Sequence, residues 1–421
     1  MASIKQIYAR EILNASGIPT VECSLWLDTG QVVTSSAPSG TSKDKYEAME
    51  LIDNDPNRMA GKGALKAVNN VNTIIAPQLI GLDPTQQERI DQLMINLDGT
   101  QNKSKLGSNA ILAVSQAALK AGAAASNMPL YAYVQHLYTL TDSYQLPSPV
   151  FSVINGGEHG AGNLDIQEFQ IIPASNVNFE SSLNIAVTFF HKLEEVLISK
   201  GAIHSVGTDG GFAPNLYNNA DAFEIMVETM KLTPFSFAQD VFMGLDVAAS
   251  SFYNNGKYAL KDKTQPYSSA ELLEYYQRIK QLYHLMSIED PFHEDDKDAW
   301  AKITAVLGDS TSIVGDSLLV TNKQRLQEAL DKKLCNGILV KPNQAGTMTE
   351  TIGVIQLAKS AKIQVTISHR SGDTTDDLVA DLAVGVGADY VKFGPPNRGE
   401  RTSKYNRLLQ ISQDLGQAQP T

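Results

Sequence analysis

Six short apolar runs in the second half of the chain each end on polar residues that suit acid–base or metal chemistry. From the second run onward they recur at intervals of roughly 25 residues, close to the length of one strand with its crossover helix. Their terminal polar residues are Asp246, Glu289 with Asp290, Asp316, Lys341, His369 and Lys392. In an eight-stranded (β/α) barrel, the carboxyl ends of the strands meet at one mouth, where such enzymes place their active sites. The pattern therefore predicts one ring of carboxylates and bases.

Three of these carboxylates predict a metal site. Asp246, Glu289 and Asp316 would repel one another at neighbouring strand ends unless a cation neutralised them. No Cys or His accompanies them at ligand spacing, and ligand sets made only of oxygen favour a hard cation, Mg²⁺ first. One polar strand end alone would more often be a solvent-facing residue, but a series of these types is typical of an active site. We therefore predict that the three carboxylates bind Mg²⁺.

The later runs supply cations and hydroxyl donors. Lys341 would lie beside Mg²⁺ and a second lysine, Lys392, and both neighbours are expected to lower its pKa, which suits it to act as a base. His369, Arg370 and Ser371 offer donors for a phosphate or a carboxylate. Together these groups fit the removal of a proton next to a carboxylate, with the resulting ene-diolate held by the metal.

The elements that must position this ring divide the chain into two domains. Residues 1–138 are predicted to form an α+β domain, in which three alternating strands precede the helices. A linker with two prolines leads into residues 139–421, where buried apolar strands alternate with helices, as in an α/β barrel. Thr321 is predicted to cap one of these helices. The predicted helices span residues 61–80, 84–95, 107–125, 128–138, 180–200, 269–285, 322–333, 347–361, 375–387 and 402–414.

Composition and charge narrow the classes of function. The chain has 421 residues and a net charge of −12, which argues against nonspecific nucleic-acid binding, because that requires a basic surface. No apolar run is long enough to span a membrane. The N-terminal residues lack the apolar core of a secretory signal, so we expect a cytoplasmic location and no membrane partner. Cys23 and Cys335 lie in apolar, strand-like runs and are predicted to be reduced core residues.

Several longer motifs resemble those of the enolase family, and the similarity runs almost from end to end. The motifs are PSG at 38–40, LDGTQNKSKLGSNAIL at 97–112, INGG-x-H at 154–159, DIQEF at 165–169, GGFAPN at 210–215, LDVAAS at 245–250, SIEDPF at 287–292, VGD at 314–316, KPNQ-x-GT at 341–347, SHRSG at 368–372 and KYNRLL at 404–409. The resemblance implies an N-terminal α+β domain followed by a barrel whose first strands and helices do not simply alternate. It also implies a homodimer or an octamer of dimers.

The resemblance implies a glycolytic lyase. Its substrate would be a small phosphorylated anion, 2-phospho-D-glycerate, which loses water reversibly to give phosphoenolpyruvate. Lys341 would take the C2 proton and Asp209 would be the acid, within the scheme described for the enolase superfamily, a lysine base with one or two Mg²⁺ ions.

The remaining site residues also follow from the resemblance. Ser39 would help to hold a second Mg²⁺ that binds with the substrate, while Asp246, Glu289 and Asp316 hold the first. The other implied residues are His159, Glu168 and Gln167 on the side where hydroxide leaves, and Arg370, Ser371 and Lys392 around phosphate and carboxylate, with His369 nearby.

The sequence departs from the family pattern at the acid and at the lid. The family's G-D-E-G-G reads Gly-Thr208-Asp209-Gly-Gly here, and the loss of one methylene withdraws the carboxyl by roughly 1.5 Å. A displacement of about 1 Å can cost about 10²-fold in rate. The carboxylate that usually follows the third metal ligand is Ser317, and a Thr is replaced by Phe393. The lid loop, residues 38–46, carries two added lysines.

These departures leave three functions open. The first is dehydration of 2-phospho-D-glycerate. The second is elimination of water from an analogue of it, as in the carboxyphosphonoenolpyruvate synthase type. The third is a catalytically weak paralogue kept for binding or scaffolding. The intact metal ligands and the intact base argue against the third, because a binding module needs neither.

Overall fold

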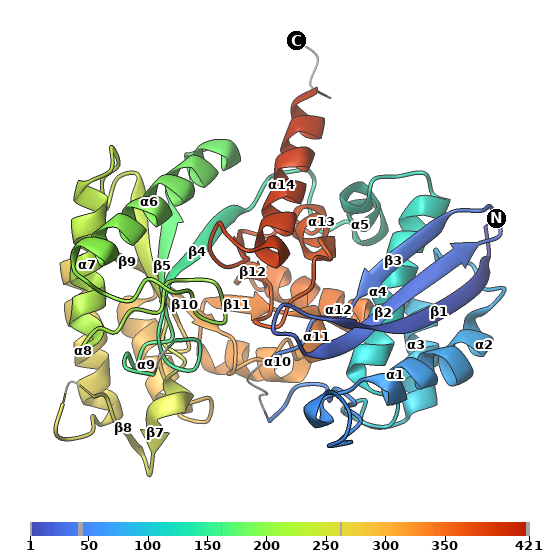
Figure 1. Cartoon of the computed structure of the whole chain (residues 1–421), viewed down its shortest axis with the longest axis horizontal. Coiled ribbons are helices and arrows are strands. Elements are labelled where there is room, and N and C mark those ends of the chain that lie inside the picture. The colour runs from blue at the N-terminus through green and yellow to red at the C-terminus, as the bar shows by residue number, and fades with distance from the viewer. Residues whose placement is uncertain (1, 41–44, 161, 262, 418–421) are drawn as a thin grey trace.

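The computed structural model describes residues 2–40, 45–160, 162–261 and 263–417. A small sheet with its helices lies beside a closed barrel of eight strands (Figure 1). The predicted fold class, a smaller α+β domain followed by an eight-stranded barrel, is confirmed. Of the helices within those ranges, none combines the length and the apolar character needed to cross a lipid bilayer.

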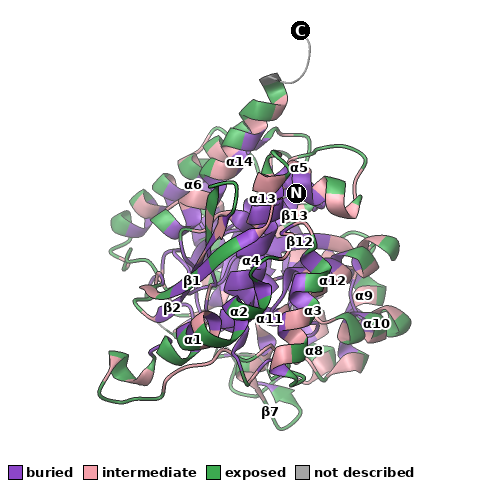
Figure 2. Ribbon diagram, turned by 90° about the vertical axis from the view of Figure 1, so that its right-hand side faces the viewer, coloured by how far each residue is buried: buried purple, intermediate pink, exposed green. Residues whose placement is uncertain are grey.

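The N-terminal sheet is an antiparallel meander, and apolar residues at alternate positions of its central strand bury one face. Helix α4 packs on β2 and β3 and also contacts α11 (Pro342–Ala345) and α12 (Met348–Ser360) of the barrel domain. Its small, apolar residues are buried almost all round, as a helix between two domains requires (Figure 2). The elements are β1 (Ile4–Leu13), β2 (Pro19–Leu27), β3 (Val32–Ser36), α1 (Leu65–Asn70), α2 (Ala76–Leu79), α3 (Gln87–Asp98), α4 (Ser108–Ala125) and α5 (Leu130–Tyr138).

The barrel closes in the order β10-β11-β12-β13-β4-β5-β6-β9. All neighbours are parallel except β5, which runs antiparallel to both β4 and β6. A loop without a crossover helix joins β4 to β5, and a parallel arrangement would require such a crossover. The six predicted strand ends all lie on barrel strands or directly after them. The strands are β4 (Ser148–Asn155), β5 (Glu168–Pro173), β6 (Val241–Asp246), β9 (Leu285–Glu289), β10 (Ser312–Gly315), β11 (Gly337–Val340), β12 (Gln364–Ser368) and β13 (Tyr390–Lys392).

The barrel helices include three that the sequence pattern did not predict: α7 (Asn219–Lys231), α9 (Lys297–Leu307) and the short α11 (Pro342–Ala345). Thr321 does not cap α10: Asn322 accepts hydrogen bonds from the amides of Gln324 and Arg325 instead. In the first domain, the helix predicted from residue 61 begins at Leu65, after a turn in which Gly61 has a positive φ. The helices are α6 (Phe179–Ser199), α7 (Asn219–Lys231), α8 (Ser269–Tyr283), α9 (Lys297–Leu307), α10 (Lys323–Lys332), α11 (Pro342–Ala345), α12 (Met348–Ser360), α13 (Leu378–Gly385) and α14 (Gly399–Gln417). A short hairpin, β7 (Tyr253–Asn254) with β8 (Lys257–Tyr258), follows β6.

One carboxylate ties the two domains together. Asp376, ahead of α13, lies 2.9 Å from Lys120 Nζ of α4 and accepts hydrogen bonds from Ser35 Oγ at 2.6 Å and the Ser36 amide at 3.0 Å. Burial raises the pKa of Asp376, but Lys120 and the hydrogen bonds outweigh burial, so the pKa lies below its usual value. The ionised side chain therefore stabilises the contact between the domains.

Replacing Asp376 with Asn is expected to lower the free energy of unfolding by about 2 kcal/mol at pH 7, because the half-buried Lys120 loses its counter-charge and the hydrogen bonds from Ser35 and Ser36 lose a charged acceptor. Since the folded pKa is depressed, this contribution is full above the unfolded pKa of about 3.9 and is lost as pH falls below it. Urea unfolding of both proteins at pH 7 and below about pH 4 tests this. The control is Asp309→Asn in an exposed turn. Equal effects of the two substitutions at pH 7 would contradict the prediction.

Candidate active site

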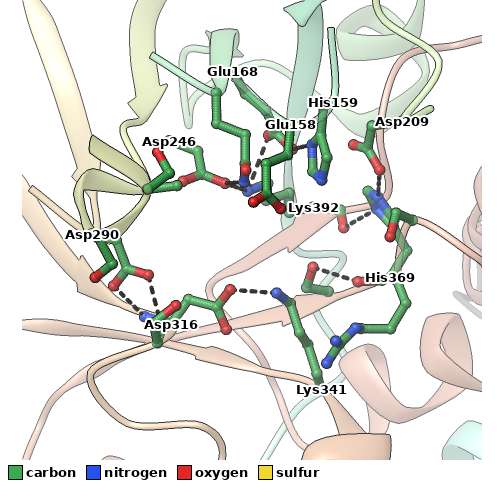
Figure 3. A pocket seen from close by; sticks show the side chains of 18 of the residues that line it. Glu158, His159, Glu168, Asp209, Asp246, Asp290, Asp316, Lys341, His369 and Lys392 are labelled. Atoms are coloured by element: carbon green, nitrogen blue, oxygen red, sulfur yellow. Dashed lines mark hydrogen bonds and ion pairs between the residues drawn. The ribbon is translucent and has the colours of Figure 1, made fainter. Parts of the chain in front are cut away.

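A cavity of about 260 Å³ opens at the carboxyl ends of the parallel barrel strands. It collects ionisable side chains that are far apart in the sequence (Figure 3). Most of the predicted site residues line it, and Glu289 and Ser39 do not. The predicted residues in its wall are His159, Gln167, Glu168, Asp209, Asp246, Asp316, Lys341, His369, Arg370, Ser371 and Lys392.

Lys392 lies among three carboxylates. Its Nζ is 3.0 Å from Asp246 Oδ2, 2.8 Å from Glu289 Oε2 and 3.0 Å from Glu168 Oε2. Asp246 and Glu289 are register partners at the ends of parallel strands β6 and β9, and Glu168 pairs with Asp246 across the reversed strand β5. Gln167 Nε2 donates to Asp246 Oδ2 at 3.2 Å. Burial lowers the pKa of Lys392, but Asp246 and the other carboxylates outweigh it and raise the pKa well above its usual value.

Lys341, the predicted base, lies next to Asp316 in the wall of the cavity (Figure 3). Its backbone amide donates to Thr321 Oγ1 at 2.9 Å, and its Nζ forms an ion pair with Asp316 Oδ2. Burial lowers the pKa of Lys341, but Asp316 more than offsets it, so the pKa is raised. The lowered pKa predicted from the sequence is therefore absent in this arrangement, because the amine is paired with a carboxylate.

The predicted metal ligands are held by two different lysines: Lys392 contacts Asp246 and Glu289, and Lys341 contacts Asp316. The carboxylate oxygens of Asp246, Glu289 and Asp316 do not all lie within 4.8 Å of one another, the spacing at which one ion could be shared. In the described residues, the ligand sets that do lie within this spacing are His159 with Glu168 and Asp209, and His293 with Glu294 and Asp295.

The chemistry of the three carboxylates nevertheless fits a divalent cation. Oε1 of Glu289 is buried and has no hydrogen-bond partner in the described residues. Burial and the neighbouring Asp246 raise the pKa of Glu289 well above its usual value, the sign of negative charge in excess of its local compensation. An all-oxygen set of this kind suits Mg²⁺.

Across the cavity from Lys341 and Asp316, His159 and Glu168 form a pair (Figure 3). Nδ1 of His159 lies 3.2 Å from Glu168 Oε1, and Ser152 Oγ donates to Glu168 Oε2 at 2.6 Å. Burial raises the pKa of Glu168, but Lys392 and His159 outweigh it and lower the pKa to about 2. Glu168 is therefore a carboxylate at neutral pH.

Two donors contact one oxygen of Asp209, the predicted acid, while its Oδ2 is buried and has no hydrogen-bond partner in the described residues. His369 Nε2 lies 2.8 Å from Asp209 Oδ1, and Arg401 donates to the same oxygen at 3.3 Å. Burial raises the pKa of Asp209, but His369 and Arg401 outweigh it and hold the pKa well below its usual value. This arrangement favours a carboxylate at Asp209 over a protonated acid.

The predicted anion-binding residues include one that is already paired. Arg370 donates to Glu47 Oε1 at 3.1 Å, and Gln344 donates to the same oxygen at 3.2 Å. Ser371 lines the cavity. Ser39 forms a short backbone bridge with Gly372, so the structure places it beside the anion-binding segment and outside the cavity wall.

Comparison with known protein families shows to which kind of barrel enzyme this cavity belongs. A model described as the enolase C-terminal TIM barrel domain matches residues 143–420, and one described as the enolase N-terminal domain matches residues 4–134. The chain belongs to the enolase family. Enolase-family membership supports a Mg²⁺-dependent, lyase-type enzyme, with acidic side chains positioned to bind metal at the barrel mouth.

The positions expected from the sequence to depart from the enolase-family pattern lie in the cavity wall or next to residues that line it. Ser317 lines it, and its amide donates to Asp290 Oδ2 at 2.8 Å. Thr208 is exposed beside Asp209, and Phe393 is buried against Tyr405. Four residues of the predicted lid, 41–44, lie outside the described residues.

Sequence reasoning missed three side chains that shape the site of this enolase-family protein. Glu47 accepts a hydrogen bond from Arg370, and Arg401 donates one to Asp209. Thr321 accepts a hydrogen bond from the backbone amide of Lys341. Glu47 lies directly after the predicted lid, which is a signal that could have identified it. Arg401 lies in a helical segment that gives no such signal, because its burial depends on how α14 packs.

Removing the charge of Glu47 should improve anion binding. Because Glu47 competes for Arg370, a Glu47→Gln variant is expected to lower KM for 2-phospho-D-glycerate by roughly threefold to tenfold with kcat little changed. Steady-state kinetics at fixed Mg²⁺ measures this. Glu158→Gln serves as the control, because Glu158 also lines the cavity but makes no contact with Arg370 that the structure shows. A raised KM in the Glu47 variant would mean that Glu47 helps to bind substrate.

Proposed function

We propose that the chain catalyses the reversible dehydration of 2-phospho-D-glycerate to phosphoenolpyruvate. The observation that carries the proposal is the placement of Lys341 in one cavity with Asp246, Asp290 and Asp316 at the strand ends and with Arg370 and Ser371. A base beside a carboxylate cluster and next to anion donors suits proton removal from a carbon that bears phosphate and carboxylate.

The residues of the chain divide the work. Asp246, Glu289 and Asp316 would hold one Mg²⁺, and Ser39 would contribute to a second that enters with the substrate. The chemistry supplied by bound Mg²⁺ is neutralisation of these carboxylates and of the negative charge that develops on the substrate carboxylate. Once Asp316 is engaged elsewhere, the amine of Lys341 loses the partner that raises its pKa and accepts the C2 proton.

The anion-binding side orients the substrate. Arg370 releases Glu47 and binds the substrate phosphate instead, and Ser371 donates a second hydrogen bond to that phosphate. This fixes C2 beside Lys341 and directs C3 with its hydroxyl toward His159 and Glu168 on the opposite wall.

The test is an assay with purified protein, 2-phospho-D-glycerate and Mg²⁺, in which the enol product is followed by ultraviolet absorbance with and without EDTA. Turnover that depends on metal, near the typical enzyme kcat of about 10 s⁻¹, supports the proposal. Absence of both turnover and exchange of the C2 proton into D₂O would refute it.

A second candidate is elimination of water from an analogue of 2-phospho-D-glycerate, of the carboxyphosphonoenolpyruvate synthase type. The residue types at Asp209, Thr208 and Ser317, which we expect to differ from the family pattern, support it, beside the base Lys341 and the three metal carboxylates that the sequence retains. C2 exchange without dehydration of 2-phospho-D-glycerate would support this candidate. For both candidates we also propose a cytoplasmic location and assembly as a homodimer or an octamer of dimers.

A further inference from the structure

Gln344 joins the carboxylate side of the cavity to its anion-binding side. It lies in α11, the short helix that follows Lys341, and is 3% exposed. Its Nε2 donates to Asp316 Oδ1 at 3.0 Å and to Glu47 Oε1 at 3.2 Å. Arg370 donates to the same oxygen of Glu47 at 3.1 Å. A continuous row of hydrogen bonds therefore runs from the proposed phosphate donor to the proposed metal ligand.

Thr321 sets the orientation of the Gln344 amide. The backbone amide of Lys341 donates to Thr321 Oγ1 at 2.9 Å, so the hydrogen of that hydroxyl goes to Gln344 Oε1, 2.7 Å away. Asp316 and Glu47 are both paired with cations, and ionised carboxylates only accept hydrogen bonds. The amino group of Gln344 therefore faces the two carboxylates and its oxygen faces Thr321. Both hydrogens and the oxygen of the amide are engaged, which fixes the side chain in one orientation.

The backbone that carries Thr321 is strained. Val320 and Thr321 have φ values of 43° and 47°, a left-handed conformation that β-branched residues rarely adopt. The carbonyl oxygen of Asp316 accepts hydrogen bonds from the amides of Leu319 and Val320, which closes a tight turn. Such strain persists where the surrounding structure imposes it, and it is concentrated at functional sites. The turn thus holds the Thr321 hydroxyl against Gln344 at a cost in backbone energy, which points to a role in the site.

We propose that Gln344 is a positioning residue that determines which oxygen of Asp316 meets the metal. The inference rests on the proposed function. Because Gln344 holds Oδ1, the oxygen left for a cation is Oδ2, the one that pairs with Lys341. Asp316 must then release the amine of Lys341 when it engages a cation. Without Gln344, the carboxylate could meet the cation through Oδ1 and keep Lys341 on Oδ2, so the base would stay paired.

A Gln344→Met variant tests this, because it keeps a side chain of similar length and removes both donors and the acceptor. Groups that orient a metal ligand typically contribute 10–100-fold, so the Kd for Mg²⁺ should rise about tenfold and C2 exchange at saturating Mg²⁺ should fall at least about tenfold. Isothermal titration calorimetry without substrate measures the first. The Kd for inorganic phosphate, measured without Mg²⁺, should not rise, because Arg370 is unaltered. The control is Gln356→Met, at an exposed position on α12.

A pair of Thr321 variants separates orientation from packing. Thr321→Val keeps the branched side chain and removes the hydroxyl, so it should lose Mg²⁺ affinity and C2 exchange as Gln344→Met does. Thr321→Ser restores the hydroxyl and should lie close to wild type in both measurements.

Wild-type Mg²⁺ binding and C2 exchange in Gln344→Met would overturn the inference and leave the proposed function intact. Equal losses in Thr321→Val and Thr321→Ser, or equal weakening of Mg²⁺ and phosphate binding in Gln344→Met, would mark a general loss of packing and would also overturn it. A wild-type protein with neither exchange nor turnover refutes the proposed function, while the Mg²⁺ titrations still decide whether Gln344 positions Asp316.

Discussion

Replacing Lys341 with alanine is expected to abolish exchange of the C2 proton of 2-phospho-D-glycerate into D₂O. The amine is the proton acceptor in the proposed reaction, and its carboxylate neighbour Asp316 is assigned to the metal. General-base contributions range from about 10² to 10⁴, and we expect the upper end here. Loss of the C2 proton resonance with time measures the exchange, and ultraviolet absorbance of the enol product measures dehydration in parallel.

The comparison variant is Lys302→Ala, which removes an exposed lysine from α9 and should exchange at the wild-type rate. Binding of 2-phospho-D-glycerate to Lys341→Ala should persist, since Arg370 and Ser371 are intact. An alanine variant that still exchanges its C2 proton would refute the assignment of Lys341 as the base.

Adding Mg²⁺ is expected to stabilise the folded chain as well as to permit turnover. Ligand binding to the folded state at about 100 times Kd contributes about 2.7 kcal/mol. The binding should also relieve repulsion among the buried carboxylates, because the pKa of Glu289 and that of Asp290 are both raised by burial and neighbouring acids. Thermal unfolding with Mg²⁺, and then with excess EDTA, measures the effect without reference to activity.

The matched variants are Asp316→Asn at the proposed metal site and Asp309→Asn in an exposed turn. The first should lose most of the rise in Tm that Mg²⁺ produces, and the second should keep it. If both variants respond like wild type, Mg²⁺ binds elsewhere and the three carboxylates are not its ligands.

The architecture was largely predictable from sequence because its signals are local. Uninterrupted apolar runs at βα spacing indicated six of the seven parallel strands, and each run ended at the carboxyl end of its strand. The reversed strand β5 carries no local signal of its direction. Helices α7 and α9 were also not predicted, although they are longer than α5 and α10, which were.

The site was predictable by position and less so by contact. Asp246, Glu289 and Asp316 lie at adjacent strand ends. Which lysine each carboxylate contacts, however, depends on the length and direction of side chains from other strands. Lys392 spans to three carboxylates, and Lys341 takes only Asp316. The raised pKa of Lys341 follows from that choice of partner, which spacing along the chain does not encode.

The reversal of β5 has a consequence for how this mouth could change. Because β4 and β5 run in opposite directions, both ends of their connection, residues 156–167, open at the cavity. His159 lies within that connection and Glu168 begins the strand after it, so a single loop sets their mutual spacing. Lys341, Asp316 and the other polar strand ends each belong to a separate structural unit. A change in the length of this loop would therefore alter the spacing of His159 and Glu168 together, and it would also reach Asp246 and Lys392, which Gln167 and Glu168 contact.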